Sequence, residues 1–280
     1  MGRNVTNRSA QGSLFAFLVV ALCLYSFAPA VWLILTSLKT TREILHVPIV
    51  YLPHPIVFKQ YVDVFAQAPF LRFIINSLIV SLTSTLICVG VATLAAYPIA
   101  RLNIKGKNAL LVGFVLISTF PLISMMVPLF QVFRDLHLLN HLITLILPYS
   151  IFSLPISILT LTAFFREIPG DLEDAARIDG CGRLGALLRV IFPLSAPGVA
   201  TAAMLAFVNG WNEFTLAFTL ISNQEKYTLP VGITLLRGQY TLPWGMMSAG
   251  ISIAILPLVF LIVVFQKSLI SGLTRGAIKG

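Results

Sequence analysis

Charged residues are scarce in this chain. Only 10% of its 280 residues are charged and 58% are hydrophobic, whereas about 25% of the residues of an average soluble domain are charged. Asp, Glu, Lys and Arg are absent from six stretches: Ser9–Leu38, Phe73–Ala100, Asn108–Phe133, Leu142–Phe165, Val190–Asn212 and Gly238–Gln266. Each stretch exceeds the ~20 residues that a helix needs to cross the hydrocarbon of a bilayer. The composition therefore excludes a soluble globular protein and predicts an integral membrane protein.

Strand-like alternation of polar and apolar residues is also lacking, although a membrane β-barrel requires it. Because lipid offers the backbone no hydrogen-bond partner, the apolar stretches should be helices. We predict an all-α membrane protein with six transmembrane helices in a single domain over residues 1–280. The expected spans are 13–38, 73–101, 108–133, 142–166, 195–221 and 245–267. Pro121 and Pro128 in the third span, and Pro148 and Pro155 in the fourth, predict kinks.

The sequence patterns of enzymes and cofactor-binding proteins are missing as well. The nucleotide-binding pattern G-x-x-x-x-G-K-[ST] does not occur, since Gly106-Lys107 lacks both the upstream glycine and the following hydroxyl residue. The three cysteines show no metal-ligand spacing. No paired acids, metal triad or Ser/His pair lies inside a predicted span. We therefore expect no catalytic residue, metal or cofactor on this chain, which argues against an intramembrane enzyme.

The net charge of +9 invites a nucleic-acid partner, but the basic residues cluster at the ends of the predicted spans. Basic residues are enriched in the cytoplasmic segments of membrane proteins. If the N-terminus is cytoplasmic, the cytoplasmic segments hold 12 basic residues and the other side holds seven. This bias predicts two cytoplasmic termini, a cytoplasmic loop between spans four and five, and contact with membrane lipid and no nucleic acid.

That cytoplasmic loop is the most charged segment of the chain, with nine charged residues in the 24 positions 166–189. Asp171 is suited to cap the start of a short helix, and Gly180 to end it in the left-handed conformation. Glu173 and Arg177 are four residues apart and are expected to pair. A second helix should carry an apolar stripe of Leu184, Leu187, Leu188 and Ile191. This helix-turn-helix suits either a solvated loop on the lipid headgroups or a short helix docked in a groove of a cytoplasmic partner.

The loop resembles the cytoplasmic signature of the permease subunits of binding-protein-dependent ABC importers. That signature reads E-A-A, a glycine after three further residues, and I-x-L-P after nine more. Here it reads Asp174-Ala175-Ala176, Gly180 and Val190-Ile191-Phe192-Pro193. Asp174, Val190 and Phe192 replace Glu, Ile and Leu, and the other signature positions match. The sequences RIDG and FREIP and the tail 272–280 are similar to the sugar-importing branch, the maltose-type second permease.

The resemblance implies a subunit of the cytoplasmic (inner) membrane of a bacterium or archaeon, paired with a second permease subunit. It also implies two ATPase subunits that carry ATP and Mg, and an extracytoplasmic solute-binding protein that delivers a sugar. ATP hydrolysis on those partners would drive alternating access. The coupling loop 167–193 would dock an ATPase subunit through residues 171–183. By the resemblance, the docked helix contains Asp174, Ala175, Ala176 and Gly180, with Asp179 beside them.

The most polar patch inside a span is Asn209–Phe214. Sugars are bound by aromatic stacking together with amides and acids. The patch offers such groups in Asn209, Trp211, Asn212 and Glu213. On a helix, residues 209, 212 and 213 share one face, whereas 211 points elsewhere. The patch is a candidate for solute contact, and the alternatives are the outer membrane interface, where tryptophan is common, or pairing across the subunit boundary.

A stand-alone secondary transporter or channel is the alternative to the permease. It predicts internal repeats and functional charges at the membrane midplane, and the sequence shows no convincing repeat and almost no midplane charge. The outer loop 222–243 is either a contact for the binding protein or a solvated loop. A disaccharide, an oligosaccharide or a related glucoside all remain open as the sugar.

Overall fold

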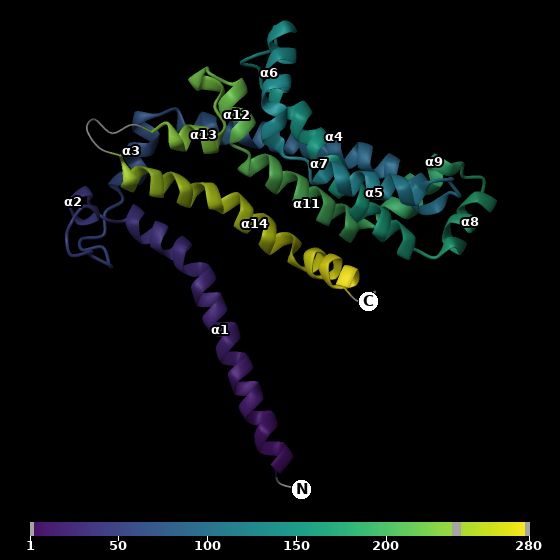
Figure 1. Ribbon diagram of the computed structural model, residues 1–280, viewed down its shortest axis with the longest axis horizontal. Coiled ribbons are helices and arrows are strands. Elements are labelled where there is room, and N and C mark those ends of the chain that lie inside the picture. The colour runs from purple at the N-terminus through teal and green to yellow at the C-terminus, as the bar shows by residue number, and fades with distance from the viewer. Residues whose placement is uncertain (1–2, 237–241, 278–280) are drawn as a thin grey trace. The chain divides into compact units, whose positions relative to one another are not determined.

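The computed structural model describes residues 3–236 and 242–277, and the side chains of residues 15–236 and 242–266. Every regular element in these ranges is helical, which confirms the predicted all-α class (Figure 1). The chain divides into two compact units, Met1–Ala68 with Leu235–Ile255 and Pro69–Thr234 with Leu256–Gly280. The tail motif 272–280 lies outside the residues whose side chains are described.

The first unit contains α1 (Arg3–Ser37), α2 (Thr41–Ile44), α3 (Lys59–Gln67) and the start of α14 (Trp244–Ala277). The second unit contains the rest of α14, from Leu256 on, and α4 (Phe70–Arg101), α5 (Lys107–Ser118), η1 (Leu122–Met125), α6 (Met126–Asp135), α7 (Ile143–Glu167) and α11 (Ala196–Asn212). The charged loop forms α8 (Gly170–Ile178), α9 (Arg183–Ala186), the π-helical turn Leu187–Ile191 and α10 (Phe192–Leu194). The segment after α11 forms α12 (Thr215–Leu220), η3 (Gln224–Lys226) and α13 (Leu229–Thr234).

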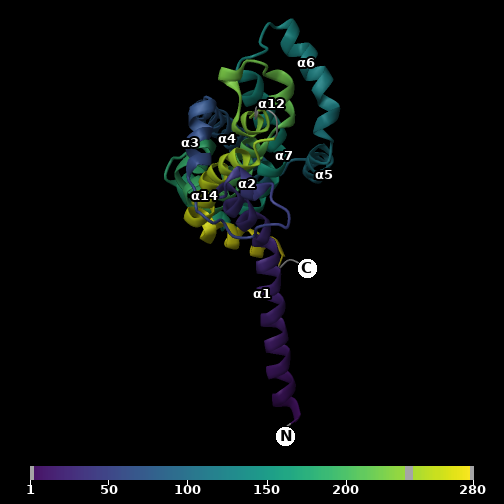
Figure 2. The ribbon, with the colours of Figure 1, turned by 90° about the vertical axis from the view of Figure 1, so that its left-hand side faces the viewer.

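Within the described residues, four helices are long and apolar enough to cross a membrane by themselves: Phe15–Ser37 of α1, α4, α7 and Trp244–Gln266 of α14. In the same residues, two further candidate spans are bent pairs of helices. Lys107–Ser118 and Leu122–Asp135 meet at 85°, and Arg183–Leu194 and Ala196–Asn212 meet at 83°. In Figure 2, α5 is seen end-on while α6 runs in the plane of the picture. The predicted number of six spans is reached when each bent pair counts as one span.

The structure interrupts two of the predicted spans. The helix expected over 108–133 breaks at Pro121, whose backbone is extended (φ −69°, ψ 121°), and proline has no N–H with which to continue a helix. The helix expected over 195–221 ends at Asn212 after 17 residues, because Glu213 is extended with ψ 126°. Pro148 and Pro155, in contrast, lie inside α7 without interrupting it.

In the second unit, α4, α7 and α11 lie side by side and form its central bundle (Figure 1). Small residues at helix interfaces allow backbones to approach closely in a membrane. α4 buries a row of them: Ser77, Ser81, Ser84, Cys88, Ala92 and Ala96. Ser150 of α7 donates to the carbonyl of Ser84 at 3.2 Å, and Cys88 donates to Ser157 Oγ at 3.3 Å. Close packing and side-chain hydrogen bonds therefore hold this bundle together.

The second half of the charged loop belongs to the core of this unit. Leu187 and Ile191 are fully buried in a cluster with residues of α4, α7 and α11. Leu184 and Leu188 are more than half exposed, so the predicted apolar stripe divides into two rows. Each row is a pair spaced i, i+4, which lies along one ridge of a helix. The loop is therefore fixed to the bundle by one ridge and presents the other outward.

We expect Gly198→Ala to destabilise the bundle, because an added Cβ would lie 2.3 Å from Cγ of Phe164. Overpacking of this kind costs about 1–3 kcal/mol, so the midpoint of thermal unfolding in detergent should fall. Gly90→Ala on α4 is the matched control, since no atom lies within 4 Å of its added Cβ. Equal midpoints for the two variants would contradict the close approach of α11 to α7.

Candidate functional site

The charged loop places α8 and α9 at one end of the central bundle, and α12 and α13 lie at the other end (Figure 1). α8 starts directly after Pro169, whose backbone is extended (φ −54°, ψ 136°), and no side chain caps its start. Asp171 lies within the first turn, so the prediction that it caps the helix is wrong. Proline at the cap position fixes the extended backbone there, and the helix begins before Asp171 is reached. Asp171 and Glu173 still place negative charge at the positive end of the helix dipole.

The end of α8 is built on a glycine, as the sequence predicts. Gly180 has a φ of +86°, a conformation that residues with a Cβ seldom adopt. Its N–H donates to the carbonyl of Arg177 at 3.1 Å, and the N–H of Cys181 donates to the carbonyl of Ala176 at 3.0 Å. These two bonds form a Schellman motif, which satisfies the last carbonyls of the helix. The turn between α8 and α9 therefore has a fixed geometry.

The outward side of α8 combines small, acidic and apolar residues. Of the five residues that the signature points to, Asp174, Ala175, Asp179 and Gly180 are exposed and Ala176 is half-buried. Ile178 is 86% exposed on the same helix. Alanine and glycine leave the backbone open to close approach, and the carboxylates are free to pair with cations. The outward side of α8 can therefore bind a basic groove on another protein.

Glu173 points to the opposite side of the same helix. Tyr97 Oη donates to Glu173 Oε1 at 2.5 Å, and Arg101 Nε lies 3.6 Å from Glu173 Oε2. The two charged side chains are only 11% and 12% exposed. Glu173 thus pairs with Arg101 of α4 and not with Arg177, contrary to the sequence prediction. Sequence reasoning assigned Arg101 only to a span end and missed Tyr97, although the two are four residues apart on one helix face.

A shallow, largely apolar hollow with a few polar groups opens beside the end of α11. Asn209, Asn212 and Glu213 line it together with Met204, Leu205 and Val208, and its volume is ≈ 420 Å³. Asn209 Nδ2 donates to Ser153 Oγ of α7 at 3.0 Å. Residues 209, 212 and 213 therefore share one side of the chain, as the sequence predicts, and all three face the hollow. Trp211 points away from it, is 2% exposed, and stacks on Phe207 with ring centroids 5.6 Å apart.

Glu213 holds the break between α11 and α12. Its carboxylate accepts hydrogen bonds from the N–H groups of Leu216 at 2.8 Å and Ala217 at 3.2 Å. These are N–H groups of the first turn of α12, which lack partners within that helix. The hydroxyl of Tyr149 on α7 also donates to Glu213. The Glu213 carboxylate, which lines the hollow, is therefore hydrogen-bonded to both α7 and α12.

At the far end of the bundle, side chains tie the segments around α12 together. Asn140, with a φ of 63°, accepts hydrogen bonds from Ser222 N at 2.7 Å, Ser222 Oγ at 3.0 Å and Asn223 N at 2.9 Å. Asn76 Nδ2 of α4 donates to the backbone carbonyl groups of Glu225 and Tyr227. The predicted loop 222–243 is therefore partly helical, with η3 and α13 in it, and its positions 237–241 lie outside the described residues.

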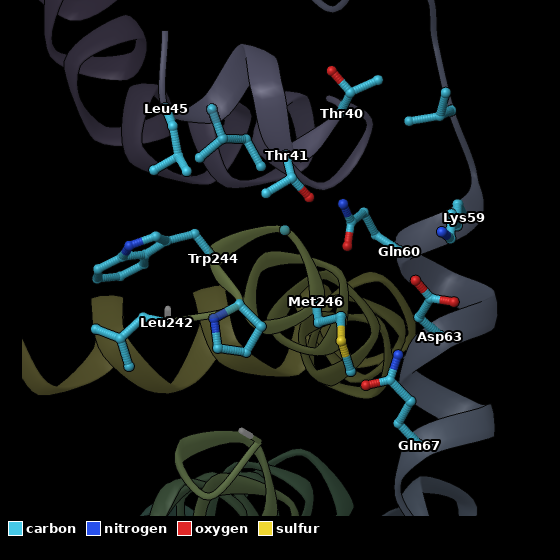
Figure 3. Close-up of a pocket in the computed structure, with 14 residues that line it drawn as sticks. Thr40, Thr41, Leu45, Lys59, Gln60, Asp63, Gln67, Leu242, Trp244 and Met246 are labelled. Atoms are coloured by element: carbon cyan, nitrogen blue, oxygen red, sulfur yellow. The ribbon is translucent and has the colours of Figure 1, made fainter. Parts of the chain in front are cut away.

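The first unit contains a separate polar cavity of ≈ 550 Å³ between the turn after α1, α3 and the start of α14 (Figure 3). Gln60 is 8% exposed and donates to the carbonyl of Lys39 at 3.4 Å. A Cβ on Gly245 would lie 2.5 Å from Gln60 Cδ, so only glycine lets this amide lie against α14. Asp63 and Trp244 also line the cavity. Its lining comes from three distant segments, which is why no sequence motif indicates it.

The helix α2 beside this cavity is held by Glu43. Thr40 N donates to Glu43 Oε2 at 2.8 Å and His54 N donates to Glu43 Oε1 at 2.7 Å. The hydrogen bond from the Thr40 backbone, followed by that from His54, lowers the pKa of the Glu43 carboxyl. The ionised form of Glu43 therefore orders the chain between α1 and α3. Among the described residues, no three His, Cys, Asp or Glu side chains are grouped as metal ligands.

Comparison with known proteins gives consistent results. The model of the family described as "Binding-protein-dependent transport system inner membrane component" matches residues 88–275. The sulfoquinovosyl glycerol transport system permease protein SmoH of Agrobacterium fabrum is 48% identical over 90% of this chain and 88% of its own length. The trehalose transport system permease protein SugB of Mycobacterium tuberculosis is 40% identical, over 91% and 93% of the two chains. A solved bacterial ABC transporter for the import of alginate has a chain with a TM-score of 0.79 and 22% identity, covering 93% of this chain and 97% of that one.

We expect Gly180→Ala to loosen the end of α8, because the left-handed conformation costs a residue with a Cβ roughly 1–2 kcal/mol. The amides of residues 179–181 should then exchange with deuterium about tenfold faster, since 1.4 kcal/mol corresponds to a factor of ten. Gly182→Ala is the control, because Gly182 has a φ of −67° and, like Gly180, open space around an added Cβ. Unchanged exchange in Gly180→Ala would show that the Schellman motif does not fix this turn.

Proposed function

Because the chain belongs to the family of binding-protein-dependent transport system inner membrane components, we propose that it carries a sugar across the membrane by alternating access, driven by ATP hydrolysis on separate subunits. The chain is a permease, a non-catalytic multi-pass membrane subunit of a carbohydrate ABC importer. SmoH and SugB are permeases for sulfoquinovosyl glycerol and trehalose, which supports a small glycoside as the solute.

The outward side of α8 is the surface on which an ATPase subunit docks. This proposal is carried by one observation: α8 exposes Asp174, Ala175, Ile178 and Asp179 while Leu187 and Ile191 of the same loop are buried in the bundle. A loop that is fixed in the bundle at one end and open to a partner at the other can pass the partner's movement to the bundle. It can transmit ATP energy only if the ATPase subunit holds α8 in both the open and the closed state of the ATPase.

The assembly contains a second permease subunit, two ATPase subunits that bind ATP and Mg, and an extracytoplasmic solute-binding protein. The bundle end that carries α8 faces the cytoplasm together with both termini, in accord with the excess of basic residues on that side. The opposite end, with α12, η3 and α13, faces the binding protein. The hydrogen bonds around Asn140 and Asn76 give that end a fixed shape to present to the binding protein.

The hollow beside α11 lies on the solute pathway, facing the second permease. Asn209 and Asn212 offer amides to the hydroxyl groups of a sugar, and Glu213 shapes the hollow by fixing the break before α12. Trp211 supports the wall from behind, where it stacks on Phe207. Broken membrane helices expose polar groups only where they line a cavity or contact protein, which supports a pathway at this break.

We expect Asp174→Lys to reduce co-purification of the ATPase subunits from detergent by about tenfold or more, because like charges brought together at an interface cost several kcal/mol. Asp135→Lys is the matched control, an equal charge reversal at an exposed acid at the end of α6. It should leave co-purification unchanged.

The same preparation separates the permease from a stand-alone transporter. If the wild-type chain carries no ATPase subunit and moves sugar into liposomes without ATP, the proposed function is wrong. If both lysine variants keep the ATPase subunits, the importer stands but the docking surface is not α8.

We expect Asn212→Ala to raise the KM of sugar transport between about twofold and tenfold, since a single lost hydrogen bond is worth about 0.5–1.5 kcal/mol. ATPase association should not change, because Asn212 is at the hollow and not on α8. Asn103→Ala, in the exposed turn before α5, is the control. Transport kinetics in proteoliposomes check this, and an unchanged KM would remove Asn212 from the pathway.

A further inference from the structure

Two adjacent acids of α8 have opposite surroundings. Asp174 is exposed, whereas the Glu173 side chain is 12% exposed and lies against α4. Successive residues of a helix point about 100° apart, so one can face a partner while the other faces the bundle. Glu173 precedes the residues that resemble the family signature, and the docking surface does not include it.

Glu173, Arg101 and Tyr97 form one connected group, here called the Glu173 latch. Tyr97 and Arg101 both lie in the last two turns of α4, and each contacts a different oxygen of the Glu173 carboxylate. The two charges are largely shielded from water, and removing one partner of such a pair leaves the other charge unpaired, which is destabilising. Breaking the latch is therefore costly, and it couples α8 to α4.

Arg101 extends the latch to a third helix. Its Nη2 donates to the carbonyl of Ile168 at 2.7 Å, and Ile168 directly follows the last residue of α7. α4 and α7 in turn share the row of small residues and the hydrogen bonds described above. A displacement of α8 is thus passed to α4 directly, and through Arg101 to the end of α7.

Glycines flank α8 on both sides. Gly170 begins the helix and Gly182 follows its closing turn, with no atom within 4 Å of the Cβ position of either. The Schellman motif at Gly180 fixes the closing turn itself, so α8 and this turn would move together. Without the latch, α8 could follow its partner while α4 stayed in place.

We infer that Glu173 is a positioning residue that makes α8 and α4 move as one body when the ATPase subunits close. This inference rests on the proposed function and adds a division of roles to it: Asp174 contacts the ATPase subunit, and Glu173 transmits the movement to the membrane helices. On α4, Arg101 and Tyr97 take up this movement through their contacts with Glu173.

Glu173→Gln tests the inference, because it keeps the shape of the side chain and removes its charge. Asp135→Asn is the matched control, with the same loss of charge at an exposed acid at the end of α6. The importer is purified with its partners, reconstituted in proteoliposomes, and measured for sugar imported per ATP hydrolysed at equal amounts of assembled complex. Glu173→Gln should retain its ATPase subunits and lower this ratio at least fivefold. Asp135→Asn should leave both the association and the ratio unchanged.

A second measurement distinguishes transmission from a merely structural contact. Hydrogen exchange of α8 and of the last turns of α4 is compared with and without ATP. In the wild type both segments should change on ATP binding, and in Glu173→Gln only α8 should. If the contact were only structural, Glu173→Gln would change the exchange rate of α4 by the same amount with ATP as without it.

An unchanged ratio in Glu173→Gln, or a loss of transport only in proportion to lost assembly, would overturn the inference. If Glu173→Gln does not assemble, Tyr97→Phe, which removes one hydroxyl from the latch, should lower the ratio about twofold, and an unchanged ratio there would overturn it as well. Absence of ATPase subunits from the wild-type preparation would instead refute the proposed function.

Discussion

Hydrocarbon cannot form hydrogen bonds, and the second unit depends on this constraint throughout. Several polar groups within the bundle bond to a neighbouring helix, as when Ser150 bonds both to its own helix at Ile146 and to Ser84 of α4. Where a helix breaks, a side chain takes over freed backbone groups, and Glu213 does so for α12. Most of the buried polar residues of α4 are small, which lets the helices approach closely.

The two ends of the bundle are built differently. Toward α8, a partly shielded charge connects the elements, with Glu173 between Arg101 and Tyr97. Toward α12, the contacts combine the amides of Asn140 and Asn76, bonded to backbone groups, with an exposed ion pair between Arg72 and Glu225. Amide contacts to the backbone mainly fix the shape of that end.

Much of the fold could be predicted from the sequence, and the failures have identifiable causes. The scarcity of charge predicts the helical membrane class, and Gly180 predicts the end of α8, because both follow from local physics. Pro121 breaks a span while Pro148 and Pro155 do not; the first is exposed and the other two are buried in the bundle, where neighbouring helices compensate for lost backbone bonds. Sequence reasoning missed the Arg101 partner of Glu173 because the two residues are far apart in the chain and no periodicity connects them.

The π-helical turn at Leu187–Ile191 has a consequence for how the loop tolerates change in length. Such a turn accommodates one residue more than an α-helical turn, and each residue of an α-helix corresponds to a rotation of about 100°. Deleting a single residue there would let the turn wind as a regular α-helix while the segments on either side keep nearly the same rotation about the axis. The loop can therefore lose one residue at Leu187–Ile191, whereas the same deletion in a regular helical turn would rotate everything before it by about 100°.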